Sequence, residues 1–213
     1  MKIIETLFDE KIMELAERKV VLAIGVFDGV HIGHRFLLKQ MVALADELEA
    51  VPVAYTFWPY PTHFHAKNRK KMIISRERKF EILDACGIQC VVEQCFEENF
   101  AKILPEDFIS FLKRKFNSLI GICVGSNFKF GHERTGDVTH HLKELCDANN
   151  LVLHIIDEIL MGGEPVSSSR IRTLLDGQDF AFASELLGGN SIFASANENE
   201  RHWDLKKTLN RTQ

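Results

Sequence analysis

The sequence predicts an α/β fold with a mostly parallel sheet covered by helices on both faces. Short apolar segments alternate along the 213-residue chain with longer segments whose apolar residues recur at helical spacing. Strands joined by helical crossovers form parallel sheets with helices on their faces. A glycine-rich run directly follows the first strong apolar segment, and ligands in such sheets bind outside the carboxyl ends of the strands.

Each expected strand is a short apolar run, and each expected helix has helical apolar spacing or an end signal. The strands are expected at 20–24, 51–57, 88–92, 119–124 and 151–156. The helices are expected at 33–48, 75–87, 105–116, 137–149, 168–175 and 180–187. Ser75 is a favoured cap residue, Gly87 a favoured helix terminator, and Pro105 suits a first helical turn.

Composition excludes several classes of protein. The chain is 46% apolar and 26% charged, and no apolar run approaches the roughly 20 residues that span a bilayer. Its N-terminus lacks a secretory pattern, so we expect a cytoplasmic protein without a membrane partner. The net charge of −4 does not favour nucleic acid. Five cysteines without a C-x-x-C pair argue against a disulfide framework and a cysteine zinc site.

The strongest functional signal is the run from Gly25 to His34. Its glycines, Gly25, Gly29 and Gly33, allow a tight turn and a close approach to a ligand. The start of the following helix would present unpaired N–H groups to an anion. His31 and His34 are three residues apart, so both rings can reach the same side and donate hydrogen bonds to phosphate oxygens. Each part alone also fits an ordinary turn.

A second anion-binding pattern is the serine run before the helix expected at 168–175. Ser167, Ser168 and Ser169 precede two arginines, Arg170 and Arg172. One interpretation is an ordinary helix cap, since serine is favoured there. The other is a phosphate site with hydroxyl, backbone and guanidinium donors.

Two further segments place aromatic residues after strands. One runs from 124 to 131 and contains Asn127 and Phe128, which either wall a ligand site or plug the core under a loop. The other runs from 56 to 61 and contains Phe57, Pro59 and Pro61. Its prolines stiffen the strand exit, next to aromatic rings on which a planar ligand would stack.

A basic stretch follows the second strand. It contains Lys67, Arg69, Lys70, Lys71, Arg76, Arg78 and Lys79. We expect a solvated surface there, with a flap over a triphosphate as the alternative.

Four of these segments carry a resemblance to a known family. The wording Phe27-Asp28-Gly29-Val30-His31, with the segments at 56–61, 124–131 and 166–172, resembles the adenylyltransferase half of bacterial FAD synthetase, the bifunctional riboflavin kinase/FMN adenylyltransferase. That family belongs to the nucleotidyltransferase superfamily. The resemblance implies a Rossmann-like, doubly wound fold. It also implies transfer of AMP from ATP to FMN, with Mg²⁺, giving FAD and pyrophosphate.

The resemblance also implies roles for individual residues. Catalysis falls to His31, His34 and Asn127. ATP contacts fall to Gly25, Phe27, Asp28, Gly29, His31, Gly33, His34, Ser167, Ser168, Ser169 and Arg172. FMN contacts fall to Phe57, Pro59, Pro61, Asn127 and Phe128. No residue is assigned as a direct metal ligand.

The domain expectation is one adenylyltransferase domain over residues 1–188 and a polar tail over 189–213, without a riboflavin kinase domain. FMN would then come from a separate riboflavin kinase or from import. Two alternatives stay open. The chain is either another coenzyme adenylyltransferase with a different acceptor, or a non-catalytic module that binds flavin or nucleotide.

Overall fold

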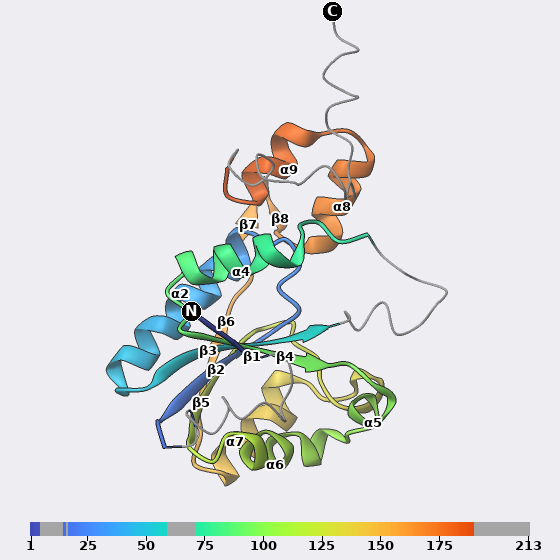
Figure 1. Cartoon of the computed structure of the whole chain (residues 1–213). Coiled ribbons are helices and arrows are strands. Elements are labelled where there is room, and N and C mark those ends of the chain that lie inside the picture. Colours follow the sequence, from blue (N-terminus) through green and yellow to red (C-terminus); the bar gives the residue numbers. More distant parts are fainter. Residues whose placement is uncertain (5–14, 16, 59–70, 190–213) are drawn as a thin grey trace, which may run out of the picture.

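The computed structural model describes residues 1–4, 15, 17–58 and 71–189, and a six-stranded sheet organises them (Figure 1). The strands are β1 (Lys2–Ile4), β2 (Val20–Ile24), β3 (Val51–Trp58), β4 (Cys90–Cys95), β5 (Leu119–Gly125) and β6 (Val152–Ile156). Their order is β1-β4-β3-β2-β5-β6, and every neighbouring pair is parallel. The predicted parallel sheet is therefore confirmed. Pro59, Pro61 and the tail beyond Gly189 lie outside the described residues.

Helices cover both faces of this sheet. They are α2 (Ile32–Glu47), α4 (Arg76–Ala85), α5 (Glu98–Ala101), α6 (Pro105–Lys115), α7 (Lys143–Ala148), α8 (Ser168–Asp176) and α9 (Phe180–Leu186). In Figure 1, α2, α4, α8 and α9 lie on one side of the sheet, and α6 and α7 lie on the other. Short helices η3 (His132–Arg134) and η4 (Val138–Leu142) and an antiparallel hairpin, β7 (Leu160–Met161) with β8 (Glu164–Pro165), complete the described fold. Among the described helices, none is long and apolar enough to cross a membrane.

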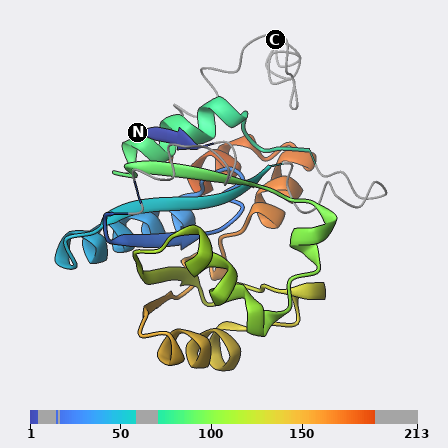
Figure 2. The ribbon, with the colours of Figure 1, turned by 60° about the horizontal axis from the view of Figure 1, so that its bottom comes forward.

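Alternation along the strands divides the core into two layers. Val21 and Ala23 of β2 pack into the layer beneath α2, whereas Val20, Leu22 and Ile24 pack into the layer beneath α6. All five residues are buried, which explains why β2 reads as an unbroken apolar run. The turned view in Figure 2 shows the two helical layers on either side of the strands.

The chain reverses its direction of growth across the sheet at β2. It passes from β2 to β3 and β4 on one side, then crosses over to β5 and β6 on the other side of β2. Ligands in open α/β sheets bind at such a switch point, outside the carboxyl ends of the strands. The turn after β2 carries the glycine run, and the turn after β5 carries Asn127.

Several elements differ from the expectation. β4 begins at Cys90 rather than Ile88, and the helix expected over 137–149 opens as the π-helix η4 before continuing as α7. The elements β1, α5, β7 and β8 have no counterpart among the expected elements. Each of them is so short that a hydrophobic period has no room to develop.

A comparison of two glycines tests the packing of the turn after β2. Gly29 (φ +83°) and Gly163 (φ +80°) share a left-handed backbone, but only a Cβ at Gly29 would press on neighbours, 3.1 Å from Leu187 and 3.3 Å from Ile73. We expect Gly163→Ala to cost about 1 kcal/mol of unfolding free energy and Gly29→Ala about 2–4 kcal/mol, measured by urea denaturation. Equal losses would show that the turn tolerates a side chain at Gly29.

Candidate active site

The turn between β2 and α2 holds an unusual backbone conformation. The N–H of Gly25 extends the ladder to the carbonyl of Tyr55 at 3.1 Å, after which the chain leaves the sheet. Phe27 has a φ of +52° and Val30 a φ of +36°, in the left-handed region that bulky residues rarely adopt. Both side chains are buried, so packing helps to hold the strain. Strain of this kind clusters at functional sites.

The turn brings the two predicted histidines into contact. His31 caps α2, because its Nδ1 accepts a hydrogen bond from the N–H of His34 at 3.3 Å. The two rings are stacked with centroids 3.6 Å apart and planes 18° apart. The ring of Phe27 stands edge-on to His34, with 5.4 Å between centroids. Gly33 permits this packing, since a Cβ there would lie 3.2 Å from His31 Nδ1.

Burial keeps both rings neutral at pH 7. It lowers the pKa of His31 to about 4 and that of His34 well below its usual value, with the neighbouring His31 adding to the effect on His34. Because Nδ1 of His31 accepts a hydrogen bond, its proton lies on Nε2. Nδ1 of His34 is buried and has no hydrogen-bond partner among the described residues. A buried polar atom in this state is suited to a ligand contact.

Asp28 ties the glycine turn to two distant segments. Its carboxylate is 3% exposed, accepts a hydrogen bond from the N–H of Ile73 at 3.1 Å, and forms an ion pair with Arg172. The hydroxyl of Ser168 donates to the Asp28 carbonyl at 2.9 Å. The structure thus joins the glycine turn to the serine run of α8, as convergence on one ligand site requires.

Arg172 reaches the turn through Asp28. Its Nη2 binds Asp28, its Nε donates to the Lys71 carbonyl at 2.9 Å, and its Nη1 donates to the Ser168 carbonyl at 3.2 Å. These bonds use three of the five N–H donors of a guanidinium. The side chain that the resemblance assigns to ATP therefore also joins α8 to the glycine turn and to the segment before α4.

The remaining polar residues at the start of α8 differ in their surroundings. Ser167 caps α8, its Oγ accepting from the N–H of Arg170 at 3.2 Å, and Ser169 is exposed. The guanidinium of Arg170 turns to the β7–β8 hairpin and donates to the carbonyls of Met161 at 2.8 Å and Glu164 at 2.9 Å. Arg170 therefore fastens the hairpin to α8 instead of facing the turn.

Of the residues expected near FMN, Phe57 and Phe128 pack in the core layer beneath α6. Phe57 is 7% exposed, and its ring packs against Phe96 and Phe100 beneath α6. Phe128 stacks on Phe130 with 5.8 Å between centroids. Asn127 follows β5, is exposed, and donates from its Nδ2 to Glu158 at 2.7 Å. Their contacts with FMN stay a prediction.

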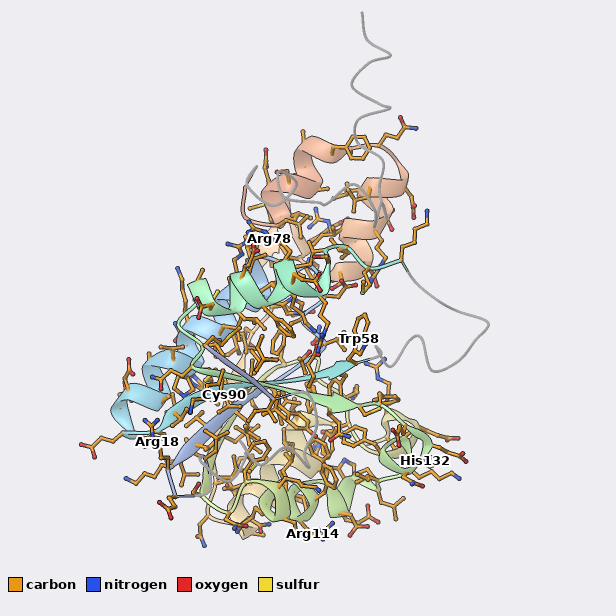
Figure 3. All side chains as sticks on the ribbon, viewed as in Figure 1. Arg18, Trp58, Arg78, Cys90, Arg114 and His132 are labelled. Atoms are coloured by element: carbon orange, nitrogen blue, oxygen red, sulfur yellow. The ribbon has the colours of Figure 1, made fainter. Side chains whose placement is uncertain are left out.

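The expectation of a solvated basic surface is wrong for Lys79. This lysine is fully buried, and its Nζ lies 3.2 Å from Glu93 and 3.4 Å from the Thr56 hydroxyl. Arg76 pairs with the second oxygen of Glu93 at 2.5 Å and lies over the ring of Trp58. Figure 3 shows Trp58 at the end of β3, below α4. One sequence signal was available, because a glutamate inside the apolar strand at 90–95 needs a cationic partner.

The described residues contain no group of three or more histidine, cysteine or acidic side chains arranged to hold a metal ion. A divalent cation here would depend on phosphate oxygens of a substrate for most of its ligands.

The lowered histidine pKa values predict acid sensitivity. An unfolded histidine takes up a proton as the pH falls through 6.5, whereas folded His31 does so only near pH 4. The contribution of His31 to the unfolding free energy is therefore at its full value above about pH 7. It falls as the pH drops toward 4, by about 1 kcal/mol per pH unit. His31→Asn keeps a capping acceptor and should reduce this slope, measured by urea unfolding between pH 7.5 and pH 5. His140→Asn, at an exposed ring, is the control, and identical slopes in both variants would contradict the prediction.

The Asp28–Arg172 pair predicts a large effect of a small substitution. Asp28→Asn leaves a guanidinium with side-chain exposure of 17% without its anion, so we expect a loss of about 2–4 kcal/mol of unfolding free energy. The exposed Lys143–Asp147 pair provides the matched control, and Asp147→Asn should cost less than about 0.5 kcal/mol. In a double-mutant cycle, Arg172→Gln should cost much less once Asp28 is replaced. Additive losses would show that the two side chains act separately.

The sequence of this chain is similar to those of proteins in a known family. A family model described as FAD synthetase matches residues 13–170. The FAD synthetase of Listeria monocytogenes is 33% identical over 173 residues, which are 80% of this chain and 69% of that protein. The bifunctional riboflavin kinase/FMN adenylyltransferase of Escherichia coli is 31% identical over 169 residues, 79% of this chain and 54% of that protein. The chain thus spans 54% of the length of the Escherichia coli relative and 59% of that of the bifunctional relative from Bacillus subtilis.

A solved structure shows the same fold. The macrolide-efflux protein from Streptococcus pneumoniae superposes with a TM-score of 0.72 and 22% identity, covering 81% of this chain and 56% of that chain. At this identity the likeness concerns the fold alone, and it confirms the α/β architecture. Together with the family match over most of the sequence, the comparisons establish that this chain belongs to the FAD synthetase family of nucleotidyltransferases.

Proposed function

We propose that this chain transfers AMP from ATP to FMN through the histidine pair at the start of α2. A phosphate oxygen of FMN attacks the α-phosphorus of ATP, a new P–O bond forms, and the bond to the pyrophosphate oxygen breaks. FAD and pyrophosphate are the products, without a covalent enzyme intermediate. The observation that carries the proposal is the stacked pair of His31, which is buried, and His34, which is half-buried, at the β2–β5 switch point.

The histidines contribute positioned hydrogen bonds rather than fixed charge. The Nε2–H of His31 is a donor for an α-phosphate oxygen, and the N-terminus of the 16-residue α2 adds backbone donors. Donors already held in place stabilise charge as it develops in the transition state. A bound triphosphate also raises the pKa of both rings, because a nearby negative charge favours the protonated form. The site therefore gains positive character when the substrate arrives.

The serine run and Arg172 are proposed to hold the leaving pyrophosphate. Ser169 is exposed, and the start of α8 offers further N–H donors. Arg172 retains donors beyond its bonds to Asp28, Lys71 and Ser168. A guanidinium shared between Asp28 and phosphate would couple nucleotide binding to the glycine turn.

The remaining assignments complete the proposal. Mg²⁺ enters with ATP and offsets charge on the phosphate oxygens. FMN binds beside the strand ends that carry Phe57, Asn127 and Phe128, next to Pro59 and Pro61. Gly25, Phe27, Asp28, Gly29 and Gly33 shape the nucleotide turn. The adenylyltransferase domain is assigned to residues 1–188, and a cytoplasmic location and FMN supply by a separate kinase or by import stay predictions of the sequence.

Formation of FAD and pyrophosphate from ATP, Mg²⁺ and FMN tests the proposal. We expect FAD from FMN and none from riboflavin. His31→Asn, which keeps the helix cap, should lower turnover by about 10²–10³-fold, the scale of one lost transition-state donor. His140→Asn should leave turnover unchanged. FMN binding without product would favour a binding module, product only with another phosphorylated acceptor would reassign the substrate, and normal turnover of His31→Asn would remove its assigned role.

A further inference from the structure

We propose that Thr56 and Lys79 are positioning residues for the adenylyl transfer, because they hold the backbone of the nucleotide turn at Val26. This inference rests on the proposed function and adds two residues to it. A chain of hydrogen bonds links both residues to the carbonyl of Val26, which lies directly before the strained Phe27.

The hydrogen bonds run in one direction. The Thr56 hydroxyl is fully buried in β3 and donates to the Val26 carbonyl at 3.1 Å. The Nζ of Lys79 lies 3.4 Å from the same hydroxyl oxygen. An ammonium group can only donate, so the oxygen of Thr56 accepts from Lys79 and its single proton is directed to Val26.

The ion pair of Lys79 with Glu93 fixes the position of the ammonium group that donates to Thr56. Burial lowers the pKa of Lys79, and the adjacent Glu93 opposes that effect. Glu93 is 2% exposed at its side chain and is held on its other oxygen by Arg76, at 2.5 Å and 2.6 Å from two guanidinium nitrogens. A buried ion pair commonly adds no stability over apolar packing of the same shape. The structural effect of this pair is to hold the Nζ of Lys79 within hydrogen-bond distance of the Thr56 hydroxyl.

The position of Val26 matters because the next residue is strained. Phe27 has a φ of +52°, which relaxes unless its surroundings prevent it. The Phe27 ring stands against His34, 5.4 Å between centroids, and His34 stacks on His31. Loss of the restraint at Val26 frees Phe27 and thereby the histidine rings. The effect should fall on the chemical step more than on ATP affinity, because the phosphate donors of α8 are untouched.

Thr56→Val tests the inference with little change of shape. We expect kcat to fall by about 10- to 100-fold, the scale of a small misplacement of catalytic groups, with KM for ATP changed less than about threefold. Thr56→Ser restores the hydroxyl and should recover most of kcat. Lys79→Met should lower kcat. The double variant with Thr56→Val should lose less than the two single losses combined, because the hydrogen bond of Lys79 reaches Val26 through Thr56; any remaining loss would come from the charge interaction of Lys79 with Asp28.

Tyr55→Phe is the matched control. It removes the hydroxyl next along β3, which donates to Gln94 at 2.9 Å and lies in the core layer beneath α6. Its unfolding midpoint should fall as in Thr56→Val, while its kcat stays within about twofold of the wild type. Should Lys79→Met fail to fold, the Thr56 series decides alone. Normal kcat in Thr56→Val, or an equal loss of kcat in Tyr55→Phe, would overturn the inference.

Histidine NMR gives a readout that does not need activity. The ring signals of His34 in the free protein should shift in Thr56→Val and return toward wild type in Thr56→Ser, but should stay in place in Tyr55→Phe. Wild-type protein that makes no FAD would refute the proposed function, and the His34 signals would still report whether Thr56 controls the turn. Unchanged signals in Thr56→Val would refute the control of the turn whether or not FAD forms.

Discussion

The buried carboxylate of Asp28 is the group on which the candidate site depends. It accepts hydrogen bonds from the N–H of Ile73 and from the guanidinium of Arg172, which is 144 positions away in the sequence. A charge that is 3% exposed is stable only where such partners replace the lost water. The glycine turn, the segment before α4 and the start of α8 must therefore assemble together. Figure 1 shows α4 and α8 on the same side of the sheet, where this assembly occurs.

A second constraint is the neutrality of the histidine pair. Two stacked rings 3.6 Å apart would repel if both were protonated, and burial already disfavours the charged form. The pair is thus stable as two neutral rings, one of them with a buried nitrogen that lacks a partner among the described residues. On the proposed function, the ATP phosphates would bring negative charge to these neutral rings and a partner for Nδ1 of His34. Such interactions lower the barrier where they are stronger in the transition state than in the bound substrate.

Strain and support are arranged around the same turn. Left-handed backbone at Phe27 and Val30 costs free energy that a loose loop would release. Asp28 restrains the turn from the side of α8, and Thr56 restrains it from β3. The turn that leads to the histidines is therefore restrained by side chains that can act without contacting the substrate.

The sequence by itself determined the parallel sheet, most helices, the family, and the glycine and serine runs as candidate ligand segments. It could do so because β2, β3 and β5 are buried apolar runs and because turn glycines and cap serines act locally. Only the tertiary structure decided the partners of the charged residues. Lys79 was expected at the surface, yet it pairs with Glu93 inside the fold. Arg172 was expected to contact the phosphates of ATP, and within the protein it pairs with Asp28. Local patterns report which face is buried, whereas pairing between distant charges depends on how the strands are ordered in space.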